Sequence, residues 1–371
     1  MIKFPDYENS ILSVTSSILK YYGAECGHKS LKVLDEKLTQ EYKNVVLMLF
    51  DGMGAKSLET ALSERSFLRQ HLECPISSVF PPTTVAATTS VQSGLSPAEH
   101  GRLGWYLYFK EAHDNVAVFS NIKQSDGKSA GKVSLADTYL PYVDICDKIK
   151  AAADVEADTV SPFSEYKCRT MRSIFTTAGK ILNKDGRHFI YCYWPQPDKD
   201  MHICGVNSLK AKMDIRRINH LAKKFCSKLS DTLVVIIADH GLIDTKWLRI
   251  EDYPKLSGML EKKPSIERRA AALFVKDGMQ GEFEKEFKNI FGDKFLLLNK
   301  NEIIDSKLFG EGRINERIDD FTGDFIAIST GDWALELQKG DTLMKGCHAG
   351  LTEQEMLVPL IIADSKCQAN L

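Results

Sequence analysis

The sequence lacks any apolar run long enough to cross a lipid bilayer, which takes about 20 residues as a helix. It also lacks an excess of charge of either sign, since its 371 residues include 48 basic and 50 acidic side chains and the net charge is −2. A chain with this balance has no bulk attraction for nucleic acid polymers or anionic membrane surfaces. We therefore expect neither of these as a partner, and the charge pattern says nothing about the oligomeric state.

The nine cysteines are scattered, odd in number and form no Cys-x-x-Cys pair. This pattern excludes a disulfide framework and a cysteine zinc site, and it predicts buried, reduced thiols. The first residues, MIKFPDYENSILSV, lack the basic region and apolar core of a secretory signal. With 43% hydrophobic and 26% charged residues, the composition is typical of a globular protein, and we expect it to be cytoplasmic.

Three continuous apolar runs predict strands that are buried on both faces, at 44–54, 188–194 and 232–241. A first helix is predicted from Ser10 to Tyr22. An amphipathic helix is predicted between the last two runs, because apolar residues there recur at alternating steps of four and three: Ala211, Ile215, Ile218, Ala222, Phe225 and Leu229. Strand, helix and strand in this order imply a right-handed crossover. The fold class is therefore α/β, with a mostly parallel central sheet flanked by helices.

The segment 243–345 has a different pattern and predicts a small α/β unit of its own. Because 346–363 returns to a core-like pattern, we interpret 243–345 as an insertion. The predicted domains are then a core of 1–242 and 346–371 and this inserted subdomain. The insertion could be a lid over an active site or an outlying decoration, and the pattern favours neither.

Each of the three apolar runs leads to an aspartate: Asp51, Asp198 and Asp239. Open α/β sheets bind ligands outside the carboxyl ends of their strands. A single aspartate at such a place is usually a helix cap or a loop residue. Three at corresponding positions favour a common site.

Three of the nine histidines lie in loop-like settings next to carboxylates or glycines: His202, His240 and His348. Together with the three aspartates they form an oxygen and nitrogen set, which suits zinc, with manganese or iron as alternatives. Six side chains exceed what one tetrahedral zinc requires, so the set favours two metal ions.

Such a site lacks only a nucleophile, and residues 80–94, FPPTTVAATTSVQSG, are dense in hydroxyl groups. Gly94 predicts the stop of a short helix whose first turn holds Thr83 or Thr84. A phosphate at that helix start would meet free backbone N–H groups and the positive end of the helix dipole. Thr88, Thr89 and Ser90 would lie inside the helix, where packing is the simpler interpretation.

The ordered motifs resemble the alkaline phosphatase superfamily, and within it the nucleotide pyrophosphatase/phosphodiesterase (type I phosphodiesterase) branch. Its pattern F-P-x-x-T-x-P-N-H-x-x-x-x-T-G has the nucleophile at the fifth residue, which is Thr84 counted from Phe80. The segments SPAEHG (96–101) and HAGLTEQEMLVPLI also resemble landmarks of the superfamily. The motifs together span about 44 to 362.

This resemblance implies two zinc sites, one formed by Asp198, His202 and His348. The other would be formed by Asp51, Asp239, His240 and the Thr84 hydroxyl. It implies a zinc-dependent hydrolase of phosphodiester or pyrophosphate bonds in small, nucleotide-type substrates, acting through a covalent phosphothreonine. Diesters are favoured over monoesters also because no obvious arginine follows the nucleophile to bind the extra charge.

The sequence departs from the branch where an asparagine would help to hold the phosphoryl oxygens, because Ala87 stands there. Asn121 and Arg102 are candidate replacements, although each also fits an ordinary polar role. Trp105 and Tyr106 could stack on a nucleobase or pack in the core. Three alternatives stay open: a phosphonoacetate-type phosphonate hydrolase, a phosphomonoesterase on the same bimetal site, and a metal-free ligand-binding relative.

Overall fold

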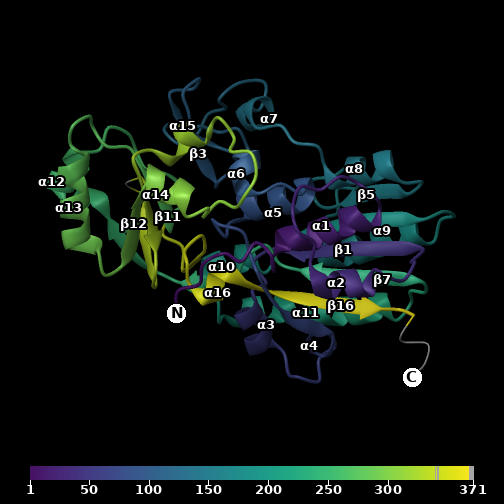
Figure 1. Cartoon of the computed structure of the whole chain (residues 1–371). Helices are drawn as coiled ribbons and strands as arrows, with labels where there is room; N and C mark the ends of the chain where they lie inside the picture. Colours follow the sequence, from purple (N-terminus) through teal and green to yellow (C-terminus); the bar gives the residue numbers. More distant parts are fainter. Residues whose placement is uncertain (339, 341, 367–371) are drawn as a thin grey trace.

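The computed structural model describes residues 1–338, 340 and 342–366, so residues 339 and 341 of the predicted insertion and 367–371 of the predicted core lie outside the described residues. Its main sheet has six strands in the order β2-β16-β7-β1-β6-β5 (Figure 1). They are β1 (Asn44–Phe50), β2 (Leu72–Ser77), β5 (Glu156–Val160), β6 (His188–Trp194), β7 (Thr232–Ile237) and β16 (Leu357–Asp364).

The predicted mostly parallel sheet is confirmed. β1 pairs in parallel with both β6 and β7, and β5 pairs in parallel with β6. β16 is antiparallel to both of its neighbours, β2 and β7. All residues of β1 and β7 are buried, which is why these strands read as unbroken apolar runs rather than alternating ones.

Helices cover both faces of this sheet (Figure 1). On one side α1, α5 and α8 pack against one another, and on the other side α11 contacts α3, α4 and α9. The predicted first helix runs from Ile11 with Ser10 as its cap. The helices of this part are α1 (Ile11–Tyr21), α2 (Lys32–Lys37), α3 (Ala55–Ala61), α4 (Phe67–Gln70), α5 (Thr84–Ser93), α6 (Pro97–His100), α7 (Leu135–Tyr139), α8 (Ile145–Ala152), α9 (Met171–Leu182), α10 (Asp198–Cys204), α11 (Leu209–Cys226) and α16 (Glu353–Met356).

A second six-stranded sheet, entirely antiparallel, lies beside the first in the order β12-β13-β11-β10-β3-β4 (Figure 1). Its strands are β3 (Tyr106–Phe109), β4 (Asp114–Ala117), β10 (Ser265–Ile266), β11 (Ala270–Leu273), β12 (Phe295–Asn299) and β13 (Phe325–Ser329). The associated helices are η1 (Ile250–Asp252), α12 (Pro254–Gly258), α13 (Gln280–Phe291), α14 (Lys300–Asp305) and α15 (Ile318–Thr322). Two short pairs complete the fold, β14 (Trp333–Glu336) with β9 (Lys246–Arg249) and β15 (Gly346–Cys347) with β8 (Ile243–Asp244).

The second sheet draws β3 and β4 from 106–117, a segment placed in the core by the predicted boundaries. The division at 243 and 345 therefore stays a prediction about chain order and does not describe which strands pair. A fully buried ion pair joins the two parts, because Arg269 of the β10–β11 turn donates to both carboxylate oxygens of Glu355 at 2.7 Å.

No helix among the described residues has the length and apolar character that a membrane span requires. The eight cysteines within the described ranges are all free thiols; five are buried as predicted, but Cys26, Cys74 and Cys204 are only half-buried.

Candidate active site

Three aspartates converge at the carboxyl edge of the main sheet because β7, β1 and β6 are neighbours in it. Asp51 directly follows β1, Asp239 comes two residues after β7, and Asp198 begins α10 after β6. Backbone contacts fix their relative positions, since Asp198 N–H donates to the Asp51 carbonyl at 3.0 Å and Gly52 N–H donates to Asp239 Oδ1 at 2.9 Å. The predicted convergence of the three strand ends is therefore observed.

Thr84 is the first residue of α5, with Thr83 as the N-cap and Gly94, at φ 70°, ending the helix as predicted. The Thr84 side chain enters the aspartate cluster, where its Oγ1 lies 3.3 Å from Asp51 Oδ1 and 3.2 Å from His240 Nε2. Further along the helix, the Thr88 hydroxyl donates to the carbonyl of Thr84. Thr84 is thus the hydroxyl of this helix that meets the carboxylates and imidazoles.

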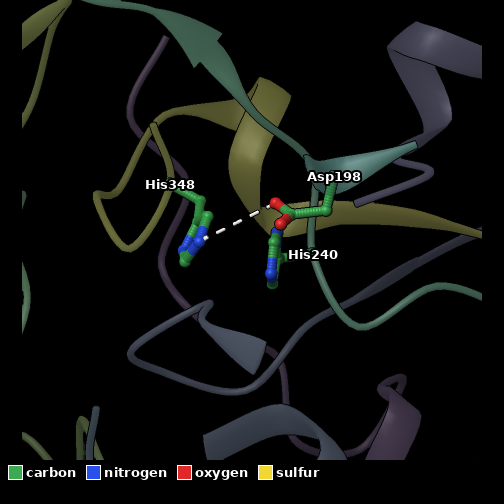
Figure 2. Close-up of side chains that lie close together, drawn as sticks. All are labelled: Asp198, His240 and His348. Carbon is green, nitrogen blue, oxygen red and sulfur yellow. Dashed lines mark ion pairs between the residues drawn. The ribbon is translucent and has the colours of Figure 1, made fainter. Parts of the chain in front are cut away.

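Two groups of donor atoms are compact enough to hold a metal ion: Asp51, Asp239 and His240, and Asp198, His240 and His348. Within each group the donor atoms lie within 4.8 Å of one another. Figure 2 shows the second group, with the His348 ring directed at Asp198. The rings of His240 and His348 are stacked with their centroids 3.9 Å apart. His240 is common to both groups and lies between them.

His202 stands at the edge of this arrangement. Its Nε2 lies 3.2 Å from Asp198 Oδ1, and its Nδ1 lies 2.7 Å from the carbonyl oxygen of Gly346. That second contact leaves Nε2 facing the carboxylate, which is the orientation that a metal-binding imidazole needs. The assignment of His202, Asp198 and His348 to one metal and of His240 to the other stays a prediction.

The cluster concentrates negative charge in a buried place. Burial, and then the neighbouring Asp239 and Asp198, raise the pKa of Asp51 well above its usual range. Burial also raises the pKa of Asp239, and its Oδ2 is buried with no hydrogen bond in the part of the chain that the structure describes. Bare carboxylates are costly in such surroundings unless cations neutralise them. The donor set therefore fits bound metal ions.

The imidazoles differ in charge. Burial lowers the pKa of His348 well below its usual value, and the nearby His240 lowers it further, so His348 is neutral, as a metal ligand must be. Burial acts to lower the pKa of His202, but the Asp198 carboxylate outweighs it and raises this pKa to about 11. A cation beside Asp198 would replace the proton that His202 otherwise holds there.

Tyr193 of β6 is a site residue that the sequence reasoning missed. Its hydroxyl donates to Asp51 Oδ2 at 2.5 Å, which orients the carboxylate toward Thr84.

We expect Tyr193→Phe to weaken metal binding by about 10- to 100-fold, as loss of a hydrogen bond to a metal ligand does. Metal titration with a chelating competitor measures this. Tyr191→Phe is the matched control, since the buried Tyr191 hydroxyl in the same strand has no hydrogen-bond partner among the described residues; equal effects of the two changes would contradict the role.

A cavity of about 420 Å³ opens over Thr84. Its wall includes the predicted residues Trp105, which is 43% exposed, and Tyr106. The cations Lys199 and Arg268 also line it and were not predicted, although Lys199 directly follows Asp198 in the sequence. The full lining consists of Thr84, Trp105, Tyr106, Asp198, Lys199, His202, Ile203, Ile266, Glu267, Arg268, Leu337, Met344, Cys347 and His348.

The other two predicted substrate-binding residues lie outside this lining. The buried Arg102 guanidinium donates to the carbonyl oxygens of Ala136 and Leu140 and pairs with Asp137 at 2.8 Å. The Asn121 amide donates to two carbonyl oxygens of its own loop. Both side chains hold loops in place. Ala87 is fully buried within α5 and offers no side-chain donor.

The fold and the site are those of the alkaline phosphatase superfamily, a class of α/β proteins with a site at the carboxyl edge of the main sheet. The chain belongs to the type I phosphodiesterase/nucleotide pyrophosphatase family, whose model matches residues 45–354. No match was found among curated protein sequences.

Several solved structures share the fold at low sequence identity. Murine ectonucleotide pyrophosphatase/phosphodiesterase 5 (ENPP5) is 15% identical with a TM-score of 0.62, over 85% of this chain and 87% of that one. An inactive threonine-to-alanine variant of it, solved in complex with AMP, has a TM-score of 0.63 at 15% identity, over 86% and 87%. Phosphonoacetate hydrolase from Sinorhizobium meliloti 1021, in complex with phosphonoacetate, is 16% identical with a TM-score of 0.62, over 85% and 89%.

Proposed function

We propose that this protein hydrolyses phosphodiester or pyrophosphate bonds in nucleotide-type small molecules, with Thr84 as the nucleophile. The observation that carries the proposal is the position of Thr84: Oγ1 lies 3.2–3.4 Å from His240 Nε2 and both oxygens of Asp51, on the wall of the cavity. Family membership and the AMP complex of the inactive murine threonine variant support the same reading.

Three carboxylates and three imidazoles of the cluster, together with Thr84, would hold two metal ions. Zinc is the preferred ion, with manganese or iron as alternatives. When bound, such ions lower the pKa of a coordinated hydroxyl and neutralise charge on the phosphoryl oxygens. Zinc as the ion in the cell and a cytoplasmic location stay predictions. The six side chains are Asp51, Asp198, His202, Asp239, His240 and His348.

The chain itself supplies the remaining chemistry. Thr84 Oγ1 forms a bond to phosphorus while the bond to the departing alcohol or phosphate oxygen breaks, which leaves a phosphothreonine. Asp51 accepts the hydrogen bond that orients the Thr84 hydroxyl. The start of α5 presents backbone N–H groups and a positive dipole end to the phosphoryl oxygens. Thr84 is then regenerated when water takes its place on phosphorus, which releases a phosphate monoester such as a nucleotide.

We also propose that 243–345 acts as a lid. Five of the residues that line the cavity belong to this segment, which supports a role in substrate choice: Ile266, Glu267, Arg268, Leu337 and Met344. Trp105 would stack on a nucleobase, since its exposed ring lies in the same wall and meets the ring of Phe119 edge-on at 6.1 Å.

A phosphonate hydrolase is the second candidate, because phosphonoacetate hydrolase shares the fold with the same TM-score as ENPP5.

A panel of four substrates separates the possibilities: bis(4-nitrophenyl) phosphate, 4-nitrophenyl phosphate, the nitrophenyl ester of thymidine monophosphate, and phosphonoacetate. We expect the two diesters to be cleaved fastest. Equal or faster cleavage of the monoester would refute the diester preference, and phosphate release from phosphonoacetate alone would favour the second candidate. Absence of bound transition metal in purified protein would favour a metal-free binding protein.

A further inference from the structure

Glu267 is a buried carboxylate beside the nucleophile helix that belongs to neither donor group. It lies in the turn between β10 and β11 and is 9% exposed. One of its oxygens, Oε1, accepts two hydrogen bonds, from the Thr83 hydroxyl at 2.6 Å and from the backbone N–H of Trp105 at 2.8 Å. Glu267 thus joins the second sheet to the start of α5 and to the cavity wall.

The hydrogen bond from Thr83 to Glu267 occurs at a helix start that has no side-chain cap. A threonine at the N-cap normally accepts a hydrogen bond from a first-turn backbone N–H, which closes the helix end. Thr83 makes no such capping bond, and its hydroxyl instead donates to Glu267. Within the described residues, no acceptor meets the N–H groups of Thr84, Val85 and Ala86. Thr84 lines the cavity, while Val85 and Ala86 are buried behind it, so the uncapped positive end of α5 lies directly behind the point where an anion would approach Thr84.

The backbone around Glu267 is strained in a way that supports this placement. Ile266 has φ 68°, a left-handed conformation that a β-branched residue rarely adopts. Such strain persists only where the surrounding structure enforces it, and it concentrates at functional sites. Gly104 lies against this residue, and a Cβ there would come within 2.7 Å of Ile266 Cγ2, so the close approach that brings Trp105 N–H to Glu267 needs glycine.

We infer that Glu267 is a positioning residue for phosphoryl binding: it holds the Thr83 hydroxyl away from the first turn of α5, so that the uncapped positive end of the helix stabilises the phosphoryl oxygens of a substrate bound at Thr84. This role rests on the proposed function of Thr84. The same role explains what stabilises the phosphoryl oxygens at a site where Ala87 offers no hydrogen-bond donor.

The test compares Glu267→Ala with the double variant Glu267→Ala/Thr83→Val in the full chain. Without Glu267, the Thr83 hydroxyl is free to cap α5 and to compete with phosphate. We expect Glu267→Ala to weaken orthophosphate binding, measured by calorimetry, and to lower kcat/KM for bis(4-nitrophenyl) phosphate, each by about 10- to 100-fold. Adding Thr83→Val removes the competing hydroxyl and should restore most of both losses. Glu267→Gln keeps the acceptor oxygen and should stay within about threefold of the wild type.

Two results would overturn the inference: Glu267→Ala behaving as the wild type, or a double variant no better than the single one. The second result would mean that Glu267 only stabilises the local structure. If Glu267→Ala does not fold, Glu267→Asp replaces it, since a side chain shorter by one methylene cannot reach Thr83. Failure of the proposed function looks different, because the wild type would then cleave no diester while the orthophosphate measurements would still distinguish the variants.

Discussion

Thr84→Ala is expected to abolish turnover, with kcat falling by at least about 10³-fold, which corresponds to about 4 kcal/mol of transition-state stabilisation. The reason is that Oγ1 of Thr84 is the atom that would bond to phosphorus, and it lies within 3.4 Å of Asp51 and His240. The alanine side chain fits the space that threonine leaves at this buried helix start. Steady-state kinetics on a nitrophenyl diester, with elemental analysis of bound metal, measure the effect.

The metal content of this variant should change little, because the carboxylates and imidazoles of both donor groups remain. Thr89→Ala is the matched control, since its hydroxyl lies in the same helix and donates to the carbonyl of Val85. This control should retain activity within a few-fold. Full activity of Thr84→Ala would move the nucleophile elsewhere, although Thr83 is already engaged by Glu267.

His240→Ala is expected to have the second largest effect, with loss of the metal ion beside Thr84 and a fall in activity of about 10³-fold or more. His240 is the one residue shared by the two groups of donor atoms, and it also contacts Thr84. It is fully buried, so water cannot easily replace the missing nitrogen. Elemental analysis after exhaustive dialysis, together with kinetics at saturating metal, measures both parts of the prediction.

His202→Ala provides the comparison, because His202 contacts Asp198 at one edge of the cluster and takes part in neither compact group. We expect it to weaken one metal site and to leave the other occupied. If His202→Ala instead emptied the site beside Thr84, the division of His202 and His240 between two metal ions would be wrong.

The apolar runs of the sequence sufficed to predict β1, β6 and β7 and the order of strand, helix and strand. Such strands are buried on both faces in a parallel sheet, so nearly every residue in them is apolar. The end of α5 was also predictable, because Gly94 stops the helix in a left-handed conformation that glycine adopts without cost.

Residues whose role depends on distant partners escaped the sequence reasoning. Tyr193 lies within an apolar strand and reads as core, yet its hydroxyl meets Asp51, 142 residues away. Glu267 and Thr83 are 184 residues apart. Arg102 and Asn121 were plausible phosphate ligands by type, but the carbonyl oxygens of nearby loops already take their donors.

The sequence by itself determined the parallel core, the three aspartates at its strand ends and the threonine at a helix start, because each of these follows from local pattern and from the rule that strand ends share an edge. Only the tertiary structure decided that His240 lies between the two groups of donors, that β3 and β4 join the second sheet, and that Glu267 reaches Thr83. These contacts bring together side chains from separate elements. Their distances depend on how the two sheets pack, which no local pattern records.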